Sequence, residues 1–322
     1  MKHIYLEETD MKKVLCIGEL LIDFFTTHTE VSIIEAKTFE KQAGGAPANV
    51  AATIAMLGGQ TYFCGKVGND AFGHFLKQTL EQAGVHTDQL IMDQSAPTTL
   101  AFVSRQKDGE RDFIFNRGAD ELLCIEDLNL QQLMISDMYH FGSATALLSE
   151  PFSKTYEQLM QTMLMQDYFI SFDPNYRADL WKHDTEQFIR KCDPFIEAAN
   201  FIKMSNEEML LFARTDNFEQ AIEWLTQFND KTIAITQGAS GTMLIQNGQI
   251  TTVPAFPVNS VDTTGAGDAF VGAVLYQLSK YEDSNLSFNE WVTVIEFANR
   301  AASKVCEKVG AIEALSSLKE LQ

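Results

Sequence analysis

One aspartate follows a glycine-rich turn and has the clearest chemical potential in this chain. Residues 259–272 read NSVDTTGAGDAFVG, in which a turn ending in Gly265 and Gly267 precedes Asp268 and an apolar run typical of a helix. Such a turn directs backbone N–H groups and the positive end of the helix dipole at one point, which suits a phosphate group. A carboxylate beside a phosphate can accept the proton of an attacking hydroxyl. The motif alone is equally consistent with an aspartate that only stabilises the first turn of a helix.

Two common nucleotide-binding patterns are excluded. The dinucleotide pattern G-x-G-x-x-G requires a glycine where Phe270 stands. The nearest approach to a Walker loop is Gly65 with Lys66, but Gln60 and Val67 occupy the positions of its first glycine and its Ser/Thr. A nucleotide would therefore bind through a different arrangement of backbone and side chains.

A second group of polar residues lies nearer the N-terminus. Asp23 lies at the end of residues 13–25, an apolar segment that predicts a buried strand, and Gly44 and Gly45 precede an alanine-rich helix with Asn49 in its first turn. Ligands of α/β proteins bind at the carboxyl ends of parallel strands, and paired donors and acceptors suit a ligand rich in hydroxyls. The alternatives are a solvent-facing acid and an ordinary helix N-terminus.

Strand and helix patterns alternate along most of the chain, which predicts an α/β fold with a doubly wound, mainly parallel sheet flanked by helices. Residues 98–103 and 111–115 instead alternate with period two around a turn at 107–109, so we expect a small antiparallel sheet that projects from the main domain. The strand patterns are residues 62–67, 138–141, 168–172, 201–203 and 232–236, and the helical patterns are 72–83, 150–165, 185–199, 218–228 and 288–308.

Composition narrows the class of protein. The 322 residues are 45% hydrophobic, enough for one large α/β domain. With a net charge of −20 and no basic patch, nucleic acid is not an expected partner, and no apolar run approaches membrane-spanning length. The five cysteines lie far apart, without C-x-x-C, and the N-terminus lacks an apolar signal core. These features predict reduced thiols and a cytoplasmic protein.

The segment VDTTGAGDAF at residues 261–270 resembles the signature of the ribokinase-like (PfkB) carbohydrate kinases, in which the last Asp is the catalytic base. The resemblance runs in order along residues 13–315. It is greatest to bacterial fructokinases, through GELLIDF, GGAPANVA, GKVGNDAFG and DPNYR. It implies ATP-dependent phosphorylation of a primary sugar hydroxyl, with D-fructose converted to fructose 6-phosphate. Asp268 would be the base, and the amides of Gly265, Ala266 and Gly267 would form an anion hole.

Other functions stay open at this point. Kinases of 2-keto-3-deoxygluconate, ribose or a nucleoside share the fold, and a non-catalytic sugar sensor could retain it. The glycines and Asp268 favour a kinase over a sensor. A nicotinamide-dependent dehydrogenase is a weaker hypothesis, because the third glycine of the dinucleotide pattern G-x-G-x-x-G is missing.

The resemblance also implies binding residues for sugar, nucleotide and ions. Members of the family usually organise Mg²⁺ through an Asn and a Glu three residues later, but here Asn206 is followed at that spacing by Met209, and Glu208 is a neighbouring acid. The implied sugar-binding residues are Asp23, Gly44, Gly45, Asn49, Phe102, Arg177 and Asp268. The implied ATP-binding residues are Thr236, Gly238, Gly241, Gly265, Gly267, Asn299 and Asn206. Asp262, Thr264 and Gly310 would surround a monovalent cation, K⁺, and Glu208 would hold Mg²⁺ through water.

The expected organisation is one kinase domain at residues 13–315, preceded by an N-terminal tail at residues 1–12. Segments within about 26–42 and 88–118 form the β lid over the sugar. In the family such lids often pair with a second subunit, so the resemblance implies a homodimer joined through the lid.

Overall fold

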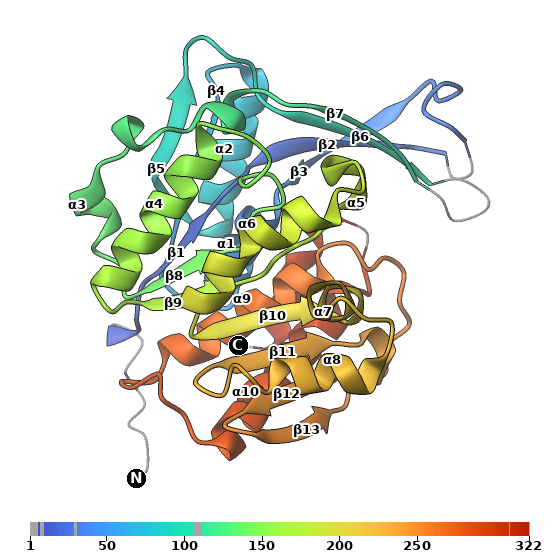
Figure 1. Cartoon of the computed structure of the whole chain (residues 1–322). Coiled ribbons are helices and arrows are strands. Elements are labelled where there is room, and N and C mark those ends of the chain that lie inside the picture. The colour runs from blue at the N-terminus through green and yellow to red at the C-terminus, as the bar shows by residue number, and fades with distance from the viewer. Residues whose placement is uncertain (1–5, 7–9, 29–30, 106–110, 309, 322) are drawn as a thin grey trace.

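The chain folds around two β-sheets (Figure 1). The computed structural model describes all residues except 1–5, 7–9, 29–30, 106–110, 309 and 322. The larger sheet has nine strands in the order β13-β12-β11-β10-β9-β8-β1-β4-β5. Its neighbours are parallel from β11 to β5, and β12 and β13 extend it antiparallel. The predicted doubly wound, mainly parallel sheet is confirmed. Its strands are β1 (Val14–Ile17), β4 (Thr61–Gly68), β5 (His86–Asp93), β8 (Met138–Phe141), β9 (Phe169–Phe172), β10 (Phe201–Ser205), β11 (Thr232–Thr236), β12 (Thr242–Gln246) and β13 (Gln249–Val253).

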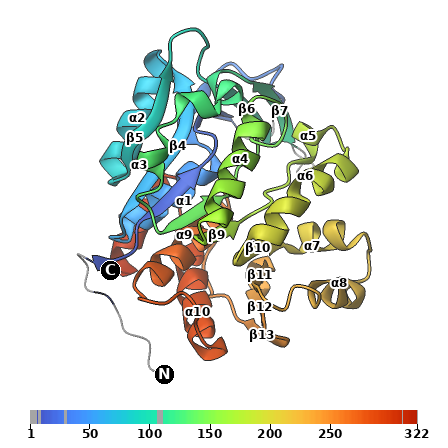
Figure 2. The same ribbon diagram turned by 60° about the vertical axis from the view of Figure 1, so that its left-hand side comes forward.

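Helices cover both faces of this sheet, as Figure 2 shows in side view. Because successive strand residues point to opposite faces, Val14 and Cys16 of β1 join one hydrophobic core, and Leu15 and Ile17 join the other. Among the described helices, none is both long and apolar enough to cross a lipid bilayer. The first core contains α1 (Ala46–Met56), α2 (Ala71–Ala83), α9 (Ala266–Ser279) and α10 (Phe288–Val305), and the second contains α4 (Phe152–Met165), α6 (Thr185–Ala198), α7 (Asn206–Ala213) and α8 (Phe218–Leu225).

A glycine at the contact lets helices α1 and α9 pack closely against each other. A Cβ atom at Gly272 would lie 2.5 Å from the Cβ of Thr53. No real side chain makes such a contact, so any larger residue would push the helices apart. The close approach brings the first turns of α1 and α9 together at the carboxyl edge of the main sheet.

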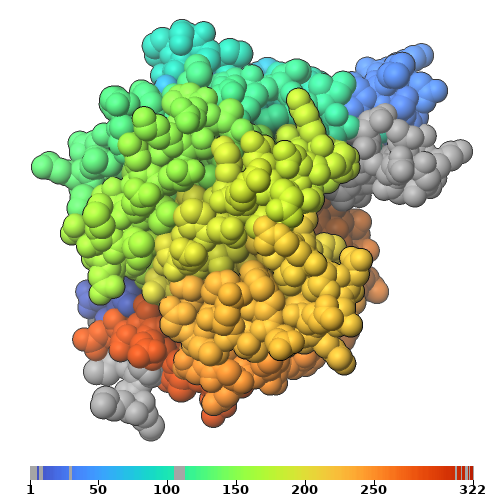
Figure 3. All heavy atoms as spheres, in the orientation of Figure 1, coloured from blue at the N-terminus to red at the C-terminus, as the bar shows by residue number. Residues whose placement is uncertain are grey.

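The second sheet projects from the domain as a lid (Figures 1 and 3). Its order is β3-β2-β6-β7, with β2/β3 and β6/β7 antiparallel and β2/β6 parallel. The turn expected at residues 107–109 lies outside the described residues. The lid strands are β2 (Leu21–Thr26), β3 (Phe39–Gly44), β6 (Leu100–Arg105) and β7 (Arg111–Asn116).

The boundaries of the lid differ from those expected. Residues 13–25 do not form one strand, because the chain leaves the main sheet after Ile17 and enters the lid at Leu21. The break occurs at Glu19, whose buried carboxylate accepts hydrogen bonds from Ala46 N (3.1 Å) and from the Ser143 hydroxyl. The lid therefore begins before residue 26. Residues 86–93 form β5 of the main sheet and do not belong to the lid.

The described part of the expected N-terminal tail contacts the domain. Leu6 N donates to Lys280 O (2.7 Å) and Lys12 N donates to Ser279 O (2.9 Å). Met11 is buried in the first core. Residues 10–12 thus pack beside the end of α9, while residues 1–5 and 7–9 lie outside the described residues.

Candidate active site

The glycine-rich turn begins α9 as expected. Gly265 is the N-cap residue and has φ +76°, a left-handed conformation that favours glycine. In the described chain no side chain caps this helix, so the turn relies on its own backbone. Ala266 N donates to Thr263 O (3.2 Å), which reduces the part that its amide can play in an anion hole. Asp268 lies in the first helical turn, where the helix dipole is positive.

Two cavities meet at this turn. The lid cavity, of about 230 Å³, lies between the lid and the first turns of α1 and α9, and Gly265 and Asp268 line it. The loop cavity, of about 570 Å³, lies between the loop after β11, the start of α9 and the helix α10, and Ala266 and Gly267 line it. A ligand in either cavity would therefore reach the same four-residue segment, and Asp268 faces the lid cavity.

The carboxylate of Asp268 is surrounded by groups that act on its pKa in opposite directions. Burial raises the pKa of Asp268 above its ordinary value. The hydrogen bond from Asn49, whose Nδ2 donates to Asp268 Oδ2 at 2.8 Å, lowers it, as do the positive charges of Arg177 and Lys203. A raised pKa makes the ionised carboxylate a stronger proton acceptor, which suits a general base.

Five of the seven expected sugar-binding residues line the lid cavity: Asp23, Gly45, Asn49, Arg177 and Asp268. Gly44 does not line it, but it makes room for a residue that does, because a Cβ at Gly44 would lie 2.0 Å from Asp23 Oδ2. Sequence reasoning missed Thr145, in the loop after β8, as part of the cavity wall.

The expectation that Phe102 binds sugar is wrong, because its side chain lies on the opposite face of the lid from the cavity. It stacks on Phe24 (ring centroids 5.0 Å apart) and meets Phe39 edge to face at 5.6 Å. Alternation along β6 and β7 instead places Val103, Phe113 and Phe115 at the cavity. The sequence showed the alternation of side chains along the lid strands, but it did not show which face of the lid would meet the ligand.

The loop cavity gathers most of the expected nucleotide-binding residues: Thr236, Gly238, Gly241, Gly267 and Asn299. Gly238 (φ +55°) and Gly241 (φ +101°) have backbone conformations that favour glycine, and a Cβ at Gly238 would meet no atom within 4 Å. Gly265 lies on the lid side instead. A cavity of this size, lined by open backbone, fits an adenine nucleotide.

Two expected nucleotide-binding asparagines have structural partners. Asn299 Oδ1 accepts from the Thr242 hydroxyl (2.7 Å), and its Nδ2 donates to Val253 O (3.0 Å) and Pro254 O (3.2 Å). Asn299 therefore shapes the wall of the loop cavity through the strand end that it holds. Asn206 does not line either cavity, and its Oδ1 accepts from Gln237 Nε2 (3.2 Å).

A buried ion pair that sequence reasoning missed lies beneath the turn. Lys203 Nζ contacts Asp173 Oδ2 at 3.0 Å, and it would lie 3.5 Å from a Cβ atom at Gly267. Burial raises the pKa of Asp173 to about 7, although the Lys203 ammonium opposes this shift. Asp173 directly follows β9 and Lys203 lies in the middle of β10, so the sequence signal was a charged residue next to or within a short apolar strand.

The candidate ion-binding residues are also placed. Asp262 Oδ1 accepts from Thr264 N (3.0 Å) and Oδ2 from Gly310 N (3.2 Å), so the three residues proposed for a monovalent cation lie together. Glu208 is buried, and its carboxylate accepts from Tyr176 N and Ser205 N, both at 2.7 Å. The Glu208 carboxylate therefore links the loop after β9 to the end of β10. Within the described residues, no group of three or more His, Cys, Asp or Glu residues could hold a metal ion.

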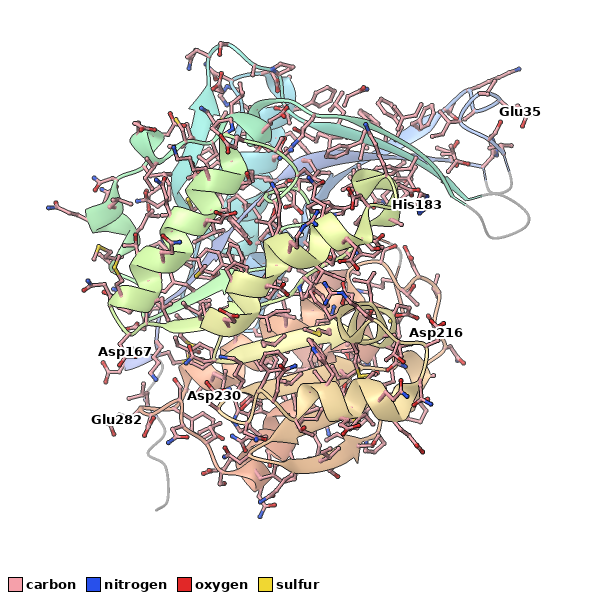
Figure 4. The ribbon with its side chains drawn as sticks, viewed as in Figure 1. Glu35, Asp167, His183, Asp216, Asp230 and Glu282 are labelled. Carbon is pink, nitrogen blue, oxygen red and sulfur yellow. The ribbon has the colours of Figure 1, made fainter. Side chains whose placement is uncertain are left out.

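A third cavity, of about 630 Å³, lies at the opposite, amino edge of the main sheet. Asp167, Asp230 and Glu282 line it, and Figure 4 shows these three acids close to one another, away from the lid. None of the expected site residues lines this cavity. The chemistry is therefore concentrated at the carboxyl edge, as is usual for α/β sheets.

The carboxyl edge can perform one kind of chemistry well. A hydroxyl compound in the lid cavity would contact Asp268, while a phosphate entering from the loop cavity would meet the amides near Gly267. Asp268 could accept the proton of the hydroxyl, and the turn could stabilise the negative charge of the phosphate. Both would promote transfer of a phosphoryl group to the hydroxyl oxygen. The arrangement supports phosphoryl transfer from a nucleotide to an alcohol.

Comparison with known proteins agrees with this chemistry. Residues 11–318 match the pfkB family carbohydrate kinase model. Fructokinase-2 of Oryza sativa subsp. japonica is 37% identical over 310 residues, which are 95% of this chain and 91% of that protein.

Solved structures of bacterial enzymes are similar over the same length. The fructokinase of Vibrio cholerae O395 bound to fructose, ADP and a calcium ion is 28% identical, with a TM-score of 0.84 and coverage of 95% of this chain and 96% of that one. A double mutant of that enzyme has a potassium ion with fructose and ADP. The ATP-bound fructokinase of Xylella fastidiosa is 29% identical, with a TM-score of 0.83 and coverage of 97% and 99%.

Proposed function

The chain belongs to the pfkB family of carbohydrate kinases and is a sugar kinase, and from that membership we propose that it phosphorylates D-fructose at the 6-hydroxyl with ATP. The observation that supports this most strongly is the position of Asp268, which faces the lid cavity and directly follows Gly267, whose backbone lines the loop cavity. Fructose would occupy the lid cavity, and ATP the loop cavity.

In the proposed reaction each part of the site has one task. Asp268 accepts the proton of the sugar hydroxyl as the hydroxyl oxygen forms a bond to the γ-phosphorus. The bond from that phosphorus to the β–γ bridging oxygen breaks, and ADP leaves. Backbone amides at Gly265 and Gly267 stabilise the charge on the transferring group, and Arg177 faces the same space.

The lid cavity supports a free hexose as the acceptor. Its volume of about 230 Å³ suits one sugar ring, and Asp23 and Asp268 offer carboxylate acceptors for hydroxyls. Arg177 is the single basic residue among its lining residues in the described chain. A sugar that already carries a phosphate would meet an acidic wall, which disfavours it. The named relatives, which are fructokinases, favour fructose over other free sugars.

We also propose the ions and the assembly. Mg²⁺ bound to the ATP phosphates would neutralise charge, and K⁺ near Asp262, Thr264 and Gly310 would order the turn before α9. The related structures that contain calcium or potassium support a cation requirement. The projecting lid supports a homodimer, and five free thiols support a cytoplasmic location.

The substrate can be tested by measuring ADP release from Mg-ATP with K⁺ present. Fructose, ribose, 2-keto-3-deoxygluconate, adenosine and fructose 1-phosphate would be compared at matched concentrations. We expect the highest kcat/KM with fructose. Preference for another of these acceptors would contradict the sugar assignment and leave the role of Asp268 in place. Sugar binding without ADP release would instead indicate a sensor.

A further inference from the structure

We propose that Asn49 is a positioning residue, which fixes the orientation of the Asp268 carboxylate in addition to making the sugar contact already expected of it. The inference rests on the proposed kinase reaction and adds a second function to a residue expected only to contact sugar. It is carried by the hydrogen bond between Asn49 Nδ2 and Asp268 Oδ2, which joins side chains 219 positions apart at 2.8 Å.

The two ends of this hydrogen bond are held rigidly. Asn49 is in the first turn of α1, where its N–H donates to Gly45 O (2.9 Å) and its C=O accepts from the Thr53 hydroxyl (2.8 Å). Asp268 is in the first turn of α9, and the Gly272–Thr53 contact locks the two helices together. The side-chain amide is therefore not needed to form α1, because the backbone of Asn49 already has its helical partners.

The chemistry of the two groups sets the direction of the amide. An ionised carboxylate only accepts hydrogen bonds, so the Asn49 NH₂ group must face Asp268 and Oδ1 must point away from it. Asn49 is only 7% exposed, it lines the lid cavity, and among the described residues its Oδ1 has no hydrogen-bond partner. A buried acceptor at the cavity wall is matched by a sugar hydroxyl as donor.

The hydrogen bond also distinguishes the two oxygens of Asp268. Oδ2 is engaged by Asn49, so Oδ1 is the oxygen left to accept the proton of the attacking hydroxyl. One amide thus orients the base through its nitrogen and the substrate through its oxygen. Misplacement of a reacting group by about 1 Å can cost on the order of 10²-fold in rate.

Two substitutions separate these functions. Asn49→Asp keeps an acceptor but replaces the permanent N–H donor with a second acid beside Asp268. The two carboxyl groups would share one proton and raise the pKa of the base, so we expect kcat at neutral pH to fall on the order of 10²-fold while the KM for sugar changes little. Asn49→Leu has a similar shape and removes both, so kcat should fall comparably and the KM for sugar should rise roughly 3- to 10-fold, the loss of one hydrogen bond. Thr162→Val is the control, because it removes a comparable hydroxyl-to-backbone hydrogen bond (to Gln158 O, 2.7 Å) on α4, which lines neither the lid cavity nor the loop cavity, and it should keep both constants.

A double-mutant cycle completes the test. If Asn49 acts on rate through Asp268, adding Asn49→Leu to Asp268→Ala should lower the residual kcat no further, while the loss of sugar affinity should persist in direct binding measurements. Independent, multiplying effects on kcat would overturn the proposal, as would an unchanged kcat in Asn49→Asp. Melting temperatures near that of the wild type show that each variant is folded. Absence of turnover in the wild-type protein would contradict the kinase assignment and is thus distinguishable from failure of this inference.

Discussion

The two edges of the main sheet both carry large cavities, yet they are built differently. At the carboxyl edge, the site consists of helix N-termini, small residues and a carboxylate that faces open space. At the amino edge, charged side chains tie loops together: Lys231 Nζ donates to Glu197 O (2.7 Å) and Ala199 O (3.1 Å), and Lys12 Nζ donates to the Ser284 hydroxyl (2.8 Å). The amino-edge cavity is the larger, so volume alone does not identify the site.

The difference follows from chain direction. In a parallel sheet each strand ends at the carboxyl edge, and the following helix starts there with its positive dipole end and free N–H groups. The amino edge receives helix C-termini, whose carbonyls attract lysines. Phosphate chemistry therefore belongs to the carboxyl edge, and the predictions below test that division from the largest expected effect to the smallest.

Removal of the base should have the largest effect. Asp268→Asn keeps the shape of the side chain but cannot accept the proton, so kcat should fall by about 10²–10⁴-fold. Sugar affinity, measured by calorimetry, should change much less because the lid cavity remains. Near-normal turnover in this variant would remove Asp268 from the mechanism.

A paired glycine substitution compares the edges directly. Gly265 (φ +76°) begins α9, and Gly248 (φ +73°) is in the β12–β13 turn at the amino edge. Alanine in this conformation costs roughly 1–2 kcal/mol at either site, and at Gly265 its Cβ would also lie 3.0 Å from the Cβ of Ala311. Both variants should lose thermal stability, but only Gly265→Ala should lose kcat/KM, by about 10-fold or more. Equal activity in the two would argue against an anion hole.

The pH dependence of activity should respond to Arg177. Burial raises the pKa of Asp268, so the acid limb of the kcat profile should lie above the ordinary titration range of aspartate. Arg177 lowers that pKa, and therefore Arg177→Gln should move the acid limb to higher pH. Arg214→Gln is a matched control, because this exposed arginine pairs with Glu186 at 3.1 Å and should leave the profile unchanged. A shift to lower pH would contradict the assigned base.

Substitutions at the amino edge should have the smallest effect. Asp167→Asn, Asp230→Asn and Glu282→Gln each change a cavity that contains none of the site residues. We expect kcat and both KM values to stay within about two-fold of the wild type, since exposed charges of this kind contribute little. A larger change in any of them would reveal a link between the two edges.

Much of the fold and part of the site were predictable because they depend on local patterns. Period-two and helical patterns located many of the strands and helices of the main sheet within a few residues, as with β11 at Thr232–Thr236, but β5 was expected in the lid. Local pattern did not reveal the break between β1 and β2, because the buried Glu19 binds Ala46 and Ser143, which lie far along the chain. The face of the lid on which Phe102 lies was undetermined for the same reason.

The sequence by itself determined the glycine-rich turn and the acid that follows it, since both are properties of a few adjacent residues. Only the tertiary structure decided that Asn49 contacts Asp268 and that Lys203 pairs with Asp173 beneath the turn. These contacts join distant segments through helix packing and strand order. Hydrogen bonds and ion pairs act over a few ångströms, and only the folded chain brings such residues within that range.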